Sequence, residues 1–225
     1  MTLEIGRVRQ NSYENFSEGQ ERSARLNRRG ELVVADFYLQ MILDGRTFHM
    51  QIGTEDAPVD STTSIDDQLV WMVADNPVGH TMIPVFYQVN AATFTTGTLP
   101  NVMLEVDRAL ARYSSGGTAY IPENLRTDRP RVAVGTFYVG TDVTVIAKTA
   151  VPGSIELWRH TGSEDVTTTS SGAENRNIAA FNARINPTAV IVGVGSCCLH
   201  NGGATADIGC YGTFDFIQLP TESVT

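Results

Sequence analysis

Short runs of Val, Ile, Thr and aromatic residues recur along the chain, and Gly or Pro signals interrupt them roughly every 8–12 residues. Such runs are typical of β-strands, and they do not alternate with long helix-like segments as the strands of a parallel α/β sheet would. We therefore predict about nine or ten strands in an all-β fold. The best match is an antiparallel β-sandwich of the jelly-roll type with an extended N-terminal arm.

The predicted strands are 31–42, 46–53, 68–75, 81–94, 101–113, 130–140, 141–150, 154–160, 188–196 and 210–219, and 177–185 is ambiguous. Asp44-Gly45 is a hairpin turn signal, so we expect 31–42 and 46–53 to pair. Pro84 indicates an edge or a bulge in its strand. Gly140 marks a turn or a bulge between its two neighbouring strands. We predict that the segment 188–196 is a core strand.

The segment Arg112–Asp128, RYSSGGTAYIPENLRTD, is polar and contains paired glycines and a proline. It cannot form a helix or a central strand, so we expect a long ordered loop that spans the two halves of the sandwich. With the loops 54–67 and 161–175, it is expected to make contacts with neighbouring molecules. The candidate interface residues in it are Tyr113, Tyr120, Pro122, Asn124 and Leu125.

The chain has 225 residues, which fits one large all-β domain with an arm. We predict an arm over 1–30, extended or partly helical, and a single jelly-roll domain over 31–225. Residues 1–30 contain six Arg and four Glu, a net charge of +2; the whole chain carries −9, so 31–225 carries −11. An acidic body argues against a nucleic-acid partner. The arm is either a solvated tail or a segment that orders on a neighbouring subunit.

The longest apolar runs are far shorter than a membrane span, so no membrane partner is expected. The first residues lack the apolar core of a signal peptide, which predicts synthesis in the cytoplasm. Three cysteines, two of them adjacent, favour free structural thiols. A metal site formed by Cys197, Cys198, His200 and Cys210, or a disulfide from Cys210, remains open. Adjacent strand residues point to opposite faces, however, so Cys197 and Cys198 cannot easily bind one ion.

The residues that could carry catalysis are scattered. His49, His80, His160 and His200 lie in different segments, and GVGSC (193–197) lacks the glycine that a nucleophile elbow needs after Ser196. Paired acids occur at Glu55/Asp56, Asp66/Asp67 and Glu164/Asp165. We interpret them as solvated loop charge, with calcium binding or glycoside hydrolysis as alternatives. We therefore predict no enzymatic activity, no cofactor and no metal.

Aromatic residues lie mostly within the predicted strands, several of them as consecutive pairs. Because neighbouring strand residues face opposite sides, one ring of each pair is expected in the core and the other at a second sheet or subunit. The alternative is a surface on which sugars stack. The residues concerned are Phe37, Tyr38, Trp71, Phe86, Tyr87, Phe137, Tyr138 and Trp158.

Four segments in this order resemble a group of tailed-bacteriophage virion proteins: RLNRRGELVVADF (25–37), RTFHMQIGT (46–54), the 112–128 loop and SIELWRH (154–160). The resemblance implies a jelly-roll capsid decoration (cement) or spike protein on the capsid surface, synthesised in the host bacterial cytoplasm. It implies a homo-oligomer, commonly a trimer, that binds the major capsid protein or other virion proteins. An arm that anchors to the shell would use Arg7, Arg9, Arg22, Arg25, Arg28 and Arg29.

Our leading hypothesis is a non-enzymatic capsid decoration protein that oligomerises and stabilises the phage head. The alternative is a virion spike or a tail-associated receptor- or glycan-binding protein. A carbohydrate-active hydrolase on a β-sandwich is the third hypothesis, and it would need two carboxylates close together in a cleft.

Overall fold

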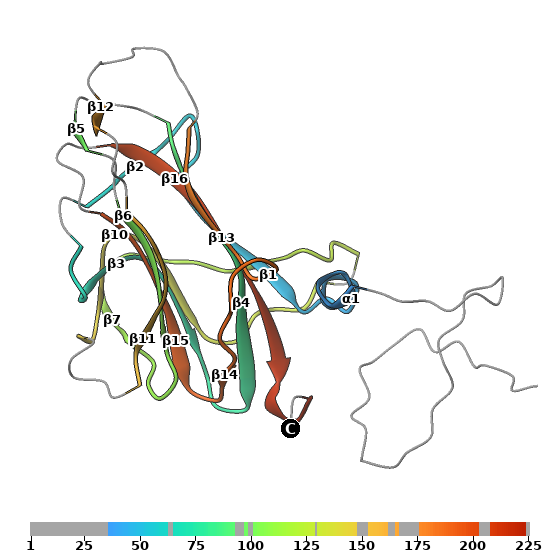
Figure 1. The fold of residues 1–225 in the computed structure, drawn as a ribbon. Helices are drawn as coiled ribbons and strands as arrows, with labels where there is room; N and C mark the ends of the chain where they lie inside the picture. Colours follow the sequence, from blue (N-terminus) through green and yellow to red (C-terminus); the bar gives the residue numbers. More distant parts are fainter. Residues whose placement is uncertain are drawn as a thin grey trace, which may run out of the picture.

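Two antiparallel β-sheets packed face to face make up most of the structure, with one short helix against the outside of one sheet (Figure 1). The computed structural model describes residues 36–62, 65–92, 97–98, 101–128, 130–147, 153–161, 165–166, 176–202 and 208–223. The predicted all-β sandwich is confirmed. The predicted arm, 1–30, lies outside the described residues.

We name each sheet after a long central strand. The β16 sheet contains, in spatial order, β13 (Arg176–Asn182), β4 (His80–Ala91), β16 (Gly209–Pro220), β1 (Thr47–Ile52) and β9 (Glu123–Asn124), with β14 (Ile191–Val192) on β4 and β2 (Val59–Asp60) on β16. The β15 sheet contains β11 (Ile155–His160), β6 (Asn101–Asp107), β15 (Gly195–Gly202), β3 (Leu69–Asn76), β10 (Thr136–Val145) and β7 (Tyr113–Ser115), with β8 (Thr118–Ala119) on β10. A separate ladder joins β5 (Gly97–Thr98) to β12 (Asp165–Val166), and the 3-10 turn η2 (Thr221–Ser223) follows β16.

The strand order is that of a jelly roll. Along the chain, its eight strands are β1, β3, β4, β6, β11, β13, β15 and β16. The β16 sheet holds the first, eighth, third and sixth of them in that spatial order, and the β15 sheet holds the second, seventh, fourth and fifth. The chain therefore crosses between the sheets in the pattern of two Greek keys. β10 is an additional strand beside β3.

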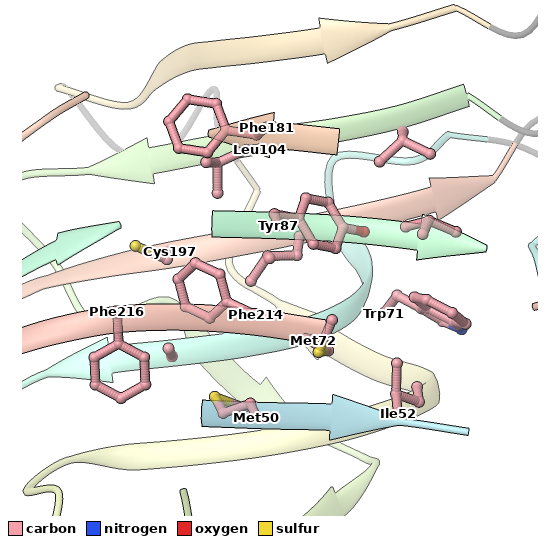
Figure 2. Packing of buried hydrophobic residues seen from close by; sticks show 14 of the residues in the cluster. Met50, Ile52, Trp71, Met72, Tyr87, Leu104, Phe181, Cys197, Phe214 and Phe216 are labelled. Carbon is pink, nitrogen blue, oxygen red and sulfur yellow. The ribbon is translucent and has the colours of Figure 1, made fainter. Parts of the chain in front are cut away.

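Large apolar side chains from both sheets fill the space between them (Figure 2). The ring of Phe216 lies at the centre of an aromatic group, with its centroid 5.6 Å from those of Phe48, Phe137 and Phe214. Trp71 is fully buried in the same cluster. Burying one such side chain contributes about 1.5–3 kcal/mol relative to leaving it exposed, so this layer is the main source of stability.

The predicted strand 31–42 and its hairpin are wrong, because Phe37–Leu43 forms the helix α1. The Asp36 carboxylate caps the helix by accepting hydrogen bonds from the backbone N–H groups of Tyr38 and Leu39. At the other end, Gly45 has φ 65° and its N–H bonds to Ile42, while Arg46 N–H bonds to the Met41 carbonyl. This pair of bonds is a Schellman motif, so Asp44-Gly45 ends a helix rather than turning a hairpin.

Most other strand predictions are confirmed with small shifts at their ends. The segments 46–53, 68–75, 154–160 and 210–219 match β1, β3, β11 and β16 to within about one residue at each end. The segment 101–113 begins with β6, which ends at Asp107, and the ambiguous 177–185 overlaps β13. The segment 81–94 overlaps β4, a central strand, and the ladder shifts register where Phe216 lies opposite Pro84. The predicted bulge at this proline is therefore confirmed.

Three more strand predictions needed correction. One strand, β10, includes parts of both 130–140 and 141–150, and its pairing with β3 shifts register between Val139 and Val143. Gly140 lies within that shift with φ 149°, so it marks a bulge and not a turn. The segment 188–196 is not a core strand, because only Ile191 is buried in β14 while Val190 and Val194 are exposed. β14 lies at the edge of its sheet, where one side has no neighbour among the described strands.

Candidate functional site: a buried arginine, its loop and an outer apolar surface

The 112–128 loop joins the two sheets, as predicted. Its first part forms β7 and β8, which pair with β10 of the β15 sheet, and its later part forms β9, which pairs with β1 of the β16 sheet. Gly116 and Gly117 have φ of 76° and 70° at the tight turn between β7 and β8. A Cβ on Gly116 would lie 2.0 Å from the carbonyl oxygen of Asp142, so only glycine fits there.

Arg112 anchors the start of this loop and is fully buried. Its Nη1 donates to Oε2 of Glu105 at 2.8 Å. Its Nε donates to the Ile146 carbonyl at 2.8 Å and its Nη2 to the Asp67 carbonyl at 2.9 Å. Ser154 Oγ donates to the other oxygen of Glu105 at 3.0 Å. The planar guanidinium therefore links three segments of the chain to β6, a geometry that a lysine could not reproduce.

Asp75, at the end of β3, accepts hydrogen bonds from the start of the 112–128 loop and from Ser196. The backbone N–H groups of Arg112 and Tyr113 donate to its two oxygens at 3.2 and 3.0 Å, and the Ser196 hydroxyl donates to it as well. Burial raises the pKa of Asp75, and these three hydrogen bonds partly offset that effect. The carboxylate thus fixes the backbone at the point where the loop leaves the sheet.

His200 completes the network from β15. Its Nδ1 lies 3.1 Å from the Leu69 carbonyl oxygen, which can only accept, so Nδ1 carries the proton. Its Nε2 lies 3.6 Å from Oε2 of Glu105. Ser196 and His200 therefore share one buried network, but each donates to a different acceptor. A nucleophile needs its base within hydrogen-bond reach and access to substrate, so this network is a structural clamp rather than a catalytic pair.

The three cysteines are free thiols, as predicted. Cys197 lies in the core between the sheets, whereas Cys198 lies on the opposite face of β15 in a second cluster with Val73 and Val143. The expected opposite orientation is confirmed. Burial raises the pKa of Cys198 and of Cys210 to about 12, so neither is a thiolate near neutral pH. Among the described residues, no group of three or more His, Cys, Asp or Glu is arranged to hold a metal ion.

The acidic pairs do not converge in the part of the chain that is described. Glu55 and Asp56 are exposed after β1. Asp66 is exposed and accepts a hydrogen bond from the Gln68 N–H at 2.9 Å, while the Asp67 carbonyl binds Arg112. The pair Glu164/Asp165 lies outside the residues whose side chains are described.

The structure gives the five candidate interface residues of the loop different surroundings. Tyr113 stacks on Tyr138 with ring centroids 3.9 Å apart, Tyr120 packs against the main core and Pro122 is buried. Asn124 donates to the Gly45 and Arg131 carbonyls. Leu125 is exposed, as is its neighbour Ile121, which the sequence analysis did not single out. The interface role of the five residues stays a prediction.

Apolar side chains are exposed around α1, on the outer side of the β16 sheet. Met41 packs onto Ile217 and Leu219, whereas Phe37, Leu39 and Leu43 are 43%, 50% and 54% exposed. Arg126 donates to the Leu43 carbonyl, which brings the loop residue Leu125 to the C-terminal end of the helix. Arg184 binds Asp36 at 3.0 Å and lies over the Tyr38 ring, which brings Ile185, 83% exposed, to the other end. We call Phe37, Leu39, Leu43, Leu125 and Ile185 the α1 surface.

Sequence reasoning singled out Leu125 but missed the α1 surface as a whole, because it assigned 31–42 to a strand. The candidate anchoring arginines of the arm, Arg7, Arg9, Arg22, Arg25, Arg28 and Arg29, lie outside the described residues.

No helix in the described part of the chain is long and apolar enough to cross a membrane. Comparisons with protein-family models, with curated proteins and with solved structures found no match to this chain.

Proposed function

We propose that the protein is a non-enzymatic structural subunit of a tailed-bacteriophage virion, a decoration or cement protein on the capsid surface. It forms homotrimers and binds the major capsid protein, so that it holds neighbouring capsid subunits together. The jelly-roll strand order and the sequence resemblance both agree with this function.

The α1 surface is the observation that carries the proposal. Three large apolar side chains of a seven-residue helix are about half exposed, and two loops add further apolar side chains at its ends. Leu39 and Leu43 are four residues apart, so they lie on one face of the helix, and exposed apolar side chains that gather in this way mark a protein contact site. A stable interface buries about 800 Å² on each partner, so these side chains form the centre of a larger contact. We assign that contact to a second copy of this chain.

Charge supports attachment through the arm. Residues 1–30 carry +2 and 31–225 carry −11, so the arm is attracted to acidic surfaces, including the body of a neighbouring copy. Asp36, the first residue that the structure describes, lies at the N-terminal end of α1, so the arm precedes the α1 surface in the chain. Many weak contacts repeated around a shell add to a strong attachment.

Binding of the purified chain to phage heads that lack it tests the proposal. We expect the full chain to co-sediment with the heads and to raise the temperature at which they release DNA. Replacing Arg25, Arg28 and Arg29 by Glu should weaken co-sedimentation, because the arm would then repel acidic surfaces. The matched control is Arg159→Glu, which changes an exposed arginine on β11. Unchanged heads after addition of the wild-type chain, and absence of the chain from purified virions, would refute the function.

A further inference from the structure

The β16 sheet carries a second surface, chemically unlike the α1 surface. α1 covers one end of its outer face (Figure 1), through Met41 on Ile217 and Leu219. Beyond the helix, the outward positions of β1, β16 and β4 are half-buried polar or aromatic residues. We call them the amide face: Gln51, Phe86, Gln88, Asn90, Tyr211 and Thr213.

The strand register brings these side chains into rows across the three strands. Gln51 pairs with Thr213, and Thr213 pairs with Gln88, so one row runs over β1, β16 and β4. Tyr211 pairs with Asn90 in the adjacent row. Neighbouring strands lie about 4.8 Å apart, so a row over three strands presents its groups across about 10 Å. That distance suits an extended ligand rather than a single small ion.

The unused polar atoms of the amide face are both donors and acceptors. Gln88 Nε2 donates to Asn90 Oδ1 at 3.0 Å, and Gln51 Nε2 donates to the Gly53 carbonyl at 3.0 Å. These bonds orient the amides, and within the part of the chain that the structure describes they leave the carbonyl oxygens of both glutamines and the N–H groups of Asn90 free to bind a ligand. The half-buried ring of Tyr211 adds an apolar face and a hydroxyl next to them.

The charge of this surface selects a neutral ligand. β1, β16 and β4 contain neither Lys nor Arg, so they offer no partner to a phosphate or a sulfate group. The carboxylate of Asp215 is paired with His49 Nδ1 at 2.6 Å. Amide and hydroxyl groups bind the hydroxyls of sugars, and aromatic rings pack on the apolar faces of sugar rings. We therefore propose that the amide face binds a neutral oligosaccharide, in addition to the structural role of the chain.

A glycan array probed with the full-length chain tests this inference, followed by titration calorimetry with the best neutral oligosaccharide on the array. The double variant Gln88→Ala, Asn90→Ala should bind at least tenfold more weakly. Thr213→Val, which removes a hydroxyl at nearly constant volume, should also weaken binding and covers the case in which the double variant fails to fold. Gln68→Ala, an exposed glutamine before β3, is the control and should bind normally.

Three results would overturn the inference: no binding to any neutral glycan, binding only to acidic glycans, and binding that the amide-face variants do not change. A loss of oligomer mass in the amide-face variants would instead assign this face to contact between copies. Head binding and glycan binding are measured separately, so either can fail without the other.

Discussion

Replacing Arg112 by Met tests whether the buried clamp holds the 112–128 loop on the sandwich. The substitution keeps most of the side-chain length but removes the positive charge and all the hydrogen bonds that the guanidinium donates. Glu105 would lose its ion-pair partner while it remains fully buried, and the Ile146 and Asp67 carbonyls would each lose a donor. The perturbation therefore removes the arginine partner of a buried carboxylate, to which Ser154 still donates, and leaves two carbonyl acceptors without their present donor.

Removing one partner of a buried ion pair costs about 3–5 kcal/mol. In a chain of this size, each kcal/mol lowers the melting temperature by about 2–4 °C, so Arg112→Met should lower it by roughly 10 °C. Replacing both Arg112 and Glu105 by Met also removes the buried carboxylate and should recover much of the lost stability. Arg112→Lys should be intermediate, because one ammonium cannot reach all three acceptors.

Urea denaturation followed by tryptophan fluorescence measures these differences, because Trp71 is fully buried in the folded protein. All variants are compared at one protein concentration, since oligomerisation changes apparent stability. The control is Arg159→Met, which breaks a pair with Glu156 whose side chains are 40% and 36% exposed and should cost less than about 1 kcal/mol. A loss below about 1 kcal/mol for Arg112→Met, or a double variant no more stable than the single one, would refute the reasoning.

Three further predictions concern other sites. The hydrogen bond that His49 donates to Asp215 raises the pKa of His49, so this pair contributes stability that is present below the ordinary histidine pKa of about 6.5 and is lost as the pH rises through the higher folded value. Asp215→Asn should therefore flatten the pH dependence of stability above about pH 6.5. The three buried thiols should resist iodoacetamide in the native protein at pH 8 and react in urea, and rapid native labelling would contradict their burial. Gly212→Ala should lower the unfolding free energy by about 1–3 kcal/mol, because its Cβ would lie 2.7 Å from the Trp71 ring; an unchanged urea midpoint would contradict this packing.

The alternation of apolar and polar residues predicted most of the sheet correctly, because period-two burial is a local property of a strand. In β1, Phe48, Met50 and Ile52 face the core while His49 and Gln51 face outward, as the sequence indicates. The same rule separated Cys197 from Cys198. It also predicts that Ser196, Cys198 and His200 share one face, a signal that could have identified part of the clamp.

The errors occurred where one local signal fits two structures. An Asp-Gly pair can turn a hairpin or end a helix. Here the Asp36 cap and the contact of Met41 with the sheet stabilise the helix. The partners of Arg112 could not be predicted, since they come from β6 and from the carbonyls of Asp67 and Ile146, which only the folded chain brings together. The amide face likewise depends on strand register, which turn signals alone did not define.

The native mass of the full-length chain across a dilution series tests the central claim most directly, because the proposed function requires self-association through the α1 surface. We expect a species of three times 24.4 kDa that persists on dilution. The double variant Leu39→Glu, Leu43→Glu should dissociate it, while Ile155→Glu on the outer strand β11 of the other sheet should leave it intact. A wild-type chain that is monomeric at every concentration, or a trimer that the α1 variant does not weaken, would contradict the account.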